Sequence, residues 1–89
     1  MLKAGVLGAG HLGKIHLKLL QQSSKYDLVG FYDPNESYAR QVSEEFGYTY
    51  IESIEELIQA VDVVDIVTPT LNHFTCAQQA IENGKHIFI

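Results

Sequence analysis

Short apolar runs alternate with stretches of helical spacing, and this alternation constrains the fold more than any other feature of the sequence. Several runs are continuously apolar, as is typical of strands buried on both faces of a parallel sheet. The five runs are Leu2–Leu7, Leu28–Tyr32, Tyr48–Ile51, Val61–Val67 and His86–Ile89. Repeated strand–helix–strand units with right-handed crossovers predict an α/β domain, a doubly wound parallel sheet (Rossmann) with strand order 3-2-1-4-5.

The stretches between the runs carry the spacing or the end signals of helices. Three of them are expected at about His11–Gln22, Asn35–Phe46 and Leu71–Glu82, and a short helix should begin at Ser53. The apolar positions of the first helix form one stripe, Leu12, Ile15, Leu19 and Leu20. Gly47 is expected to end the second helix in the left-handed conformation, and Asn83-Gly84 to end the last.

Length and charge limit the classes of partner. The 89 residues suit one domain, and 46% hydrophobic with 19% charged residues is typical of a globular protein. A net charge of −5 gives no attraction for nucleic acid or an anionic membrane surface, so neither is an expected partner. The single cysteine, Cys76, excludes an internal disulfide and suits a reducing compartment, and no signal peptide or membrane span is evident. We therefore expect a cytoplasmic location.

A G-x-G-x-x-G string follows the first predicted strand and opens the first predicted helix. Gly8 permits a tight turn, Gly10 lets a pyrophosphate approach the backbone, and Gly13 lets the helix pack closely on the sheet. Phosphates would lie on free backbone N–H groups at the positive end of the helix. The cofactor-binding candidates here are Gly8, Gly10, His11, Leu12 and Gly13. The alternative is a glycine-rich turn that binds no ligand.

Asp33 lies 20 residues beyond Gly13, at the end of the second predicted strand. Dinucleotide-binding folds place at this position the carboxylate that accepts hydrogen bonds from the adenosine ribose. The alternative is that Asp33, followed by Pro34, only starts a turn. The order of strand, glycines, helix, strand and acid favours ligand binding.

Thr68-Pro69-Thr70 ends the fourth predicted strand, beside the first, where the strand order reverses. Ligands of open α/β sheets bind at such a switch point, so Thr68, Pro69 and Thr70 are further candidates for cofactor contact. The alternative for Thr70 is a cap of the next helix.

The glycine loop, Asp33, residues 63–70, His73 and Gly84-Lys85-His86 together resemble the N-terminal domain of the Gfo/Idh/MocA oxidoreductase family. The resemblance covers the whole chain and adds His73 to the cofactor-binding candidates. It implies the cofactor half of a two-domain, NAD(P)-dependent enzyme that exchanges hydride with a sugar, polyol or related carbinol. The family's Glu-Lys-Pro motif and substrate domain would follow Ile89, so no catalytic residue is assigned and the chain alone is expected to be inactive.

The expected cofactor is NAD, with NADP less favoured. A 2′-phosphate beside Asp33 would meet like charge, and the two residues that follow, Pro34 and Asn35, carry no compensating charge. A small-molecule substrate is expected for the full-length protein. Homo-oligomers, or association of the chain through its last strand, are consistent with an unprotected sheet edge at Ile87–Ile89.

Two other classes share part of this pattern. A non-enzymatic dinucleotide sensor also has a glycine loop followed by an acid, although it needs no Gly-Lys-His strand. A methyltransferase that uses S-adenosylmethionine shares an early glycine loop and a ribose-binding acid, but Gly13 and the Thr-Pro strand end argue against it.

Other polar residues have structural interpretations. His16 matches a histidine common in the family, and a packed or hydrogen-bonded helix residue is expected rather than a catalytic one. His73 and Cys76 lie three apart, but no further ligand has the spacing of a metal site, so Cys76 is expected to be a buried apolar residue. Asp65 interrupts an apolar strand; it either pairs with His86 or faces a helix terminus at the sheet surface.

Overall fold

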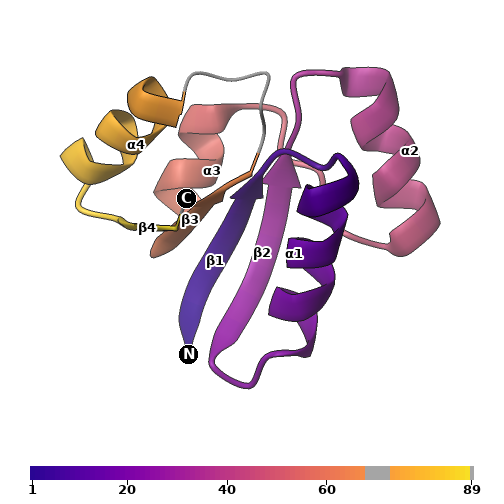
Figure 1. Cartoon of the computed structure of the whole chain (residues 1–89), viewed down its shortest axis with the longest axis horizontal. Helices are drawn as coiled ribbons and strands as arrows, with labels where there is room; N and C mark the ends of the chain where they lie inside the picture. The colour runs from indigo at the N-terminus through magenta and orange to yellow at the C-terminus, as the bar shows by residue number, and fades with distance from the viewer. Residues whose placement is uncertain (68–72, 89) are drawn as a thin grey trace.

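A parallel sheet lies between two layers of helices (Figure 1). The computed structural model describes residues 1–67 and 73–88. The elements are β1 (Leu2–Leu7), α1 (His11–Gln22), β2 (Tyr26–Tyr32), α2 (Glu36–Phe46), α3 (Ile54–Ala60), β3 (Val63–Ile66), α4 (His73–Glu82) and β4 (His86–Phe88). The sheet has the order β2-β1-β3-β4, and every neighbouring pair is parallel. The doubly wound α/β class is therefore confirmed.

The apolar run Tyr48–Ile51, expected to be a full strand, forms only one isolated bridge, between Tyr50 and Phe31. Phe31 N donates to Thr49 O at 2.9 Å, and Ile51 N donates to Phe31 O at 2.7 Å. The run therefore lies beside β2, the position expected for it, but the described sheet has four strands rather than five. Ser43 Oγ of the preceding helix donates to Tyr48 O, which ties the start of this run to α2.

Capping residues set the ends of the helices. Asn35 accepts from Tyr38 N at the start of α2, and Ser53 accepts from Glu56 N at the start of α3. Gly47 ends α2 with φ of 79°, in the left-handed region where glycine is favoured, as predicted. The expected starts and ends of α1 and α2 are confirmed to within one residue, and Leu71, the expected start of the last helix, lies outside the described residues.

The core consists of two clusters, one on each face of the sheet. Figure 1 shows α1 and α2 on one side of β1 and β2, and α3 and α4 on the other. The α1 face buries Val6, Leu17 and Phe31, and the α3 face buries Leu7, Leu57 and Ile66. Cys76 is buried in the second cluster, as expected. No helix in the described ranges is long and apolar enough to cross a membrane.

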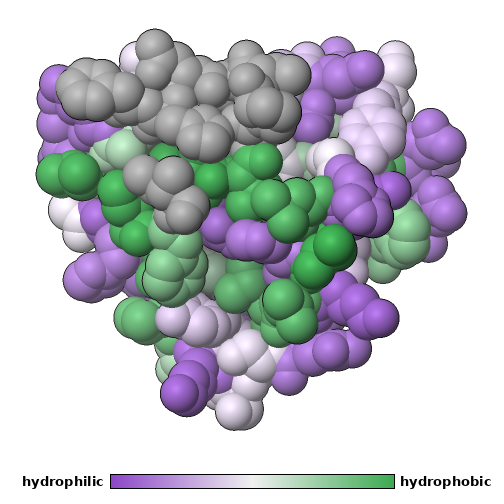
Figure 2. Space-filling view, in the orientation of Figure 1, coloured by the Kyte–Doolittle hydropathy of each residue, from purple (hydrophilic) through white to green (hydrophobic). Residues whose placement is uncertain are grey.

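The apolar stripe predicted for α1 is not the face that the helix buries, since only Leu20 of its four residues is buried. Leu17 and Leu20 face the sheet with Gly13, whereas Leu12, Ile15 and Leu19 are exposed, Leu19 by 60%. A helix that packs on a sheet with one side buries only the residues of that side. The apolar residues of α1 therefore divide between a buried face toward the sheet and an exposed face. Figure 2 shows apolar side chains gathered across the middle of the face viewed there.

The pairing of β1 with β2 contains one irregularity. Ala4 lies opposite Leu28, but the next residue, Gly5, lies opposite Gly30, so Val29 is an extra residue in β2. Beyond this bulge the strands stay in register as far as Leu7 and Tyr32, where both lead into the loops of the candidate site.

Candidate functional site

The loop after β1 turns sharply at its first glycine. Gly8 has φ of 109°, a backbone conformation that L side chains rarely adopt. Its N–H donates to Tyr32 O at 2.6 Å, which ties the loop to the end of β2. The glycine loop and the residue after β2 are therefore held together at the carboxyl edge of the sheet.

The other two loop glycines differ in what surrounds them. A Cβ built on Gly13 would lie 2.2 Å from Gly8 O, so α1 approaches the turn as closely as backbone atoms allow. A Cβ built on Gly10 would meet no atom within 4 Å among the described residues. Gly10 thus borders open space at the start of α1, where a ligand can reach the backbone.

Among residues 1–67 and 73–88, no side chain caps the beginning of α1. Gly10 is the N-cap, and no acidic residue lies in the first turn, whereas α2 and α3 have Asn35 and Ser53 as caps. The first N–H groups of a helix need partners from outside the helix, and an anionic ligand can supply them. His11 and Leu12, both exposed, are the first residues of this turn.

Asp33 lies directly against the glycine loop. Its carboxylate accepts from Ala9 N at Oδ2 and from Asn35 N at Oδ1, each at 2.9 Å. Tyr38 Oη donates to Ala9 O at 2.7 Å, so the same loop residue is held from α2 as well. Asp33 also makes the turn of the alternative interpretation, but each carboxylate oxygen has a further lone pair to accept a ligand hydroxyl.

The remaining candidates follow β3 and begin α4. Val67 N donates to Leu7 O at 3.0 Å, so the chain leaves β3 beside the glycine loop. Thr68, Pro69 and Thr70 lie outside the described residues, and His73 is the first residue of α4. The structure brings together the glycine loop and Asp33, and the side chain of His73, like the three residues before it in the candidate set, is outside what the structure describes.

Neither alternative for Asp65, a pair with His86 or a place at the sheet surface facing a helix terminus, matches the structure. His86 lies opposite Val63 and Phe88 lies opposite Asp65, so the two predicted partners are two residues out of register. Asp65 Oδ2 instead lies 2.6 Å from His16 Nδ1 on α1. The Asp65 side chain is 5% exposed, and Oδ1 has no hydrogen-bond partner in the part of the chain that the structure describes.

Sequence reasoning missed this pair because it considered only a neighbouring strand and a helix terminus, and His16 lies within the body of α1. Asp65 is on the same face of the sheet as Val63, and that face packs against α1. His16, which was expected to be packed or hydrogen-bonded, adjoins Leu17, a buried residue of the same helix. A buried carboxylate needs a hydrogen-bond donor. The signal that could have identified His16 is therefore a polar residue on the side of α1 that faces the sheet.

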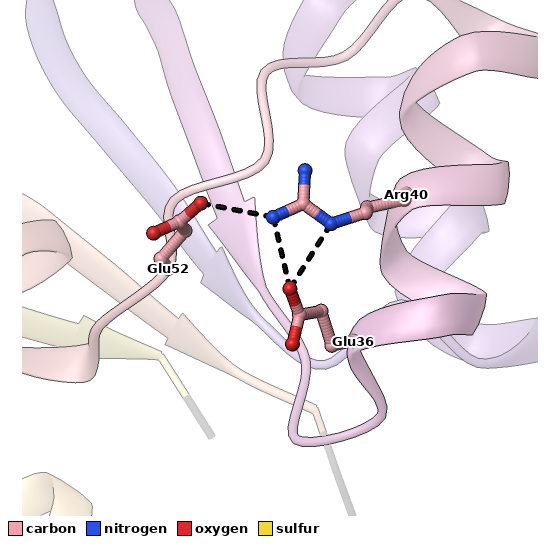
Figure 3. A network of polar contacts seen from close by, with 3 residues as sticks. All are labelled: Glu36, Arg40 and Glu52. Carbon is pink, nitrogen blue, oxygen red and sulfur yellow. Dashed lines mark hydrogen bonds and ion pairs between the residues drawn. The ribbon is translucent and has the colours of Figure 1, made fainter.

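A second polar cluster lies on the α2 side of Asp33. Arg40 Nη2 donates to Glu36 Oε1 at 2.9 Å and to Glu52 Oε1 at 3.0 Å, and Arg40 Nε also donates to Glu36, at 3.1 Å (Figure 3). The hydrogen bond to Glu36, followed by that to Glu52, raises the pKa of the Arg40 guanidinium above its usual value. The ring of Tyr50 lies 5.6 Å from Arg40 Cζ.

A glycine turn tied to a buried carboxylate at the edge of a doubly wound sheet defines the dinucleotide-binding class of α/β domains. Residues 2–89 match GFO_IDH_MocA, the oxidoreductase family with an NAD-binding Rossmann fold, and the chain belongs to this family. The resemblance noted from the sequence is confirmed.

The relatives with curated functions are sugar and polyol dehydrogenases. The chain is 38% identical over 88 residues to UDP-N-acetylglucosamine 3-dehydrogenase of Acidithiobacillus ferrooxidans, covering 99% of the chain and 28% of the relative. It is 40% identical over 93 residues to scyllo-inositol 2-dehydrogenase (NAD(+)) of Bacillus subtilis, covering 98% of the chain and 27% of the relative. The chain thus spans about a quarter of the length of these relatives.

Solved structures agree with the fold. The Acidithiobacillus ferrooxidans UDP-N-acetylglucosamine 3-dehydrogenase matches with a TM-score of 0.84 and 36% identity, covering 99% of this chain and 28% of that one. GenD2 from gentamicin A biosynthesis, in complex with NAD, matches at 0.84 and 26% identity, over 97% and 25% of the two chains. Biliverdin reductase from Synechocystis, with biliverdin and NADP+, matches at 0.87 and 25% identity, over 97% and 28%. Both nicotinamide cofactors therefore occur among the neighbours.

Proposed function

We propose that this chain is the cofactor-binding part of an enzyme that transfers hydride between NAD and a sugar, polyol or related carbinol substrate. The observation that carries the proposal is the hydrogen bond from Ala9 N to Asp33 Oδ2, which joins the phosphate-loop candidate to the ribose-binding candidate. The substrate class follows from the curated relatives, which act on UDP-N-acetylglucosamine, inositols and glucose 6-phosphate. Substrate contacts would come from the rest of a longer protein.

The described residues fit a dinucleotide. Within the part of the chain that the structure describes, Gly10 borders open space and no side chain caps the first turn of α1. Asp33 keeps lone pairs for ribose hydroxyls. In this assignment the N–H groups of His11, Leu12 and Gly13 hold the pyrophosphate, and Asp33 holds the adenosine ribose. When bound, the nicotinamide supplies hydride chemistry. Thr68, Pro69, Thr70 and His73 remain proposed contacts for the cofactor.

The proposal includes a preference for NAD over NADP. Asp33 is 9% exposed, and Glu36 adds a second carboxylate in the first turn of α2. A 2′-phosphate there would face like charge at up to about 4 kcal/mol per pair at 4 Å and an effective dielectric of 20, before screening by salt. A 2′-hydroxyl can instead donate to Asp33.

Cytoplasmic location remains a prediction from the single cysteine.

Titration of the isotope-labelled chain with NAD and NADP, followed by NMR, tests this proposal. We expect NAD to shift the amide signals of Gly10 and His11 at lower concentration than NADP. Asp33→Ser should weaken this preference, and Asp27→Ser, which changes an exposed residue at the other end of β2, is the matched control. Tighter binding of NADP by the unmodified chain would refute the NAD assignment, and no binding of either cofactor would refute the proposed function.

A further inference from the structure

The cation nearest to Asp33 along the chain is already engaged by carboxylates. Arg40 is the sole Lys or Arg between Lys25 and Lys85 in the sequence. It lies one helical turn after Glu36, and its Nε and Nη2 groups both donate to Glu36, while Nη2 also donates to Glu52. The guanidinium thus has acidic partners on two sides, as Figure 3 shows.

Backbone contacts place both glutamates near Asp33. Asn35 N donates to Asp33 Oδ1 at 2.9 Å, and Glu36 is the next residue. On the other side, Ile51 N donates to Phe31 O at 2.7 Å. Glu52 comes directly after Ile51, and Asp33 comes two residues after Phe31, so both acids lie just beyond this hydrogen bond. The Glu36–Arg40–Glu52 cluster therefore lies beside the turn that holds the ribose-binding candidate.

This position matters for a phosphate on the ribose. A phosphate monoester has about −1.5 to −2 charges at neutral pH and is recognised by arginine through paired N–H groups. Here two carboxylates, those of Glu36 and Glu52, share one guanidinium, and the nearby carboxylate of Asp33 adds a third negative charge. A 2′-phosphate would have to compete with Glu36 and Glu52 for Arg40 and would still lie in a field of net negative charge.

Resting on the proposed function, we propose that Glu36 and Glu52 are specificity-determining residues that discriminate against a 2′-phosphorylated cofactor by occupying Arg40. Removal of both charges frees a guanidinium that the ring of Tyr50 already contacts. Because Arg40, Glu36 and Glu52 are more than half exposed, at 54%, 66% and 69%, their ion pairs contribute little to folding. Their replacement should therefore change recognition without unfolding the chain.

The test compares NAD and NADP binding by NMR titration of the 89-residue chain, with adenosine 2′,5′-bisphosphate and 5′-AMP as smaller probes. We expect the double variant Glu36→Gln/Glu52→Gln to bind NADP and the bisphosphate about fivefold more tightly relative to NAD and 5′-AMP. This factor assumes that the 2′-phosphate and the two removed carboxylates are separated by about one Debye length. Adding Arg40→Gln should abolish that gain.

The matched control is Glu44→Gln/Glu45→Gln, which removes the same charge from exposed positions in the last part of α2. An unchanged preference in the Glu36/Glu52 variant, or an equal change in the control, would overturn the inference while NAD binding, and with it the proposed function, stands. A gain that persists without Arg40 would also overturn it. Failure of the unmodified chain to bind NAD or 5′-AMP would instead overturn the proposed function on which the inference rests.

Discussion

Substitution of Gly13 by alanine should destabilise the fold, although alanine is the better helix former. The added Cβ would lie 2.2 Å from Gly8 O and 2.8 Å from Gly8 C, and neither atom can rotate away as a side chain would. Overpacking of this kind costs about 1–3 kcal/mol, and a clash with backbone belongs at the upper end. The gain in helix propensity offsets at most about 1 kcal/mol. The net loss is therefore about 2 kcal/mol.

Thermal unfolding followed by circular dichroism measures this loss. For a domain of this size, about 2 kcal/mol lowers Tm by roughly 8–16 °C. Gly10→Ala is the matched control, because its Cβ meets no atom within 4 Å among the described residues. It should stay within about 1 kcal/mol of the unmodified chain while binding NAD at least about tenfold more weakly. Equal Tm values for the two variants would refute this division of roles between the glycines.

Two further predictions concern contacts outside the glycine loop. His16→Leu leaves the Asp65 carboxylate buried without its partner, so the free energy of unfolding measured in urea should fall by about 2 kcal/mol. Adding Asp65→Val should restore most of this loss, and equal losses in the single and double variants would contradict the prediction. The outer edge of β4 has no partner strand in the described sheet, so the chain should self-associate at micromolar concentration and Phe88→Lys should reduce this association. Sedimentation that gives a monomer mass at all concentrations would show otherwise.

Local signals in the sequence predicted the helices well. Gly47 and Ser53 act within their own segments, and both occupy the caps expected of them. The same holds for the glycine loop, since the conformation at Gly8 and the close approach at Gly13 depend on residues within one strand–turn–helix unit. Where the physical cause lies within about six residues, a sequence pattern is enough to find it.

Contacts between distant elements were harder to predict. Tyr48–Ile51 has the composition of a strand, but pairing needs a neighbour along its whole length, and it meets β2 only at Phe31. Neither alternative for Asp65 found His16, because strand register and the rotation of α1 against the sheet are set by contacts between distant elements. Tyr38 was missed altogether, since no motif marks a helix tyrosine that donates to Ala9 O.

The bulge in β2 makes one residue of that strand geometrically dispensable. If Val29 were deleted, Leu28 would still lie opposite Ala4 and Gly30 opposite Gly5, with sides alternating as in an unbroken ladder. A deletion at Phe31 would instead move Tyr32 and Asp33 to the opposite faces of the sheet. At Val29, therefore, β2 can lose one residue without moving the carboxylate of Asp33 beside the phosphate loop.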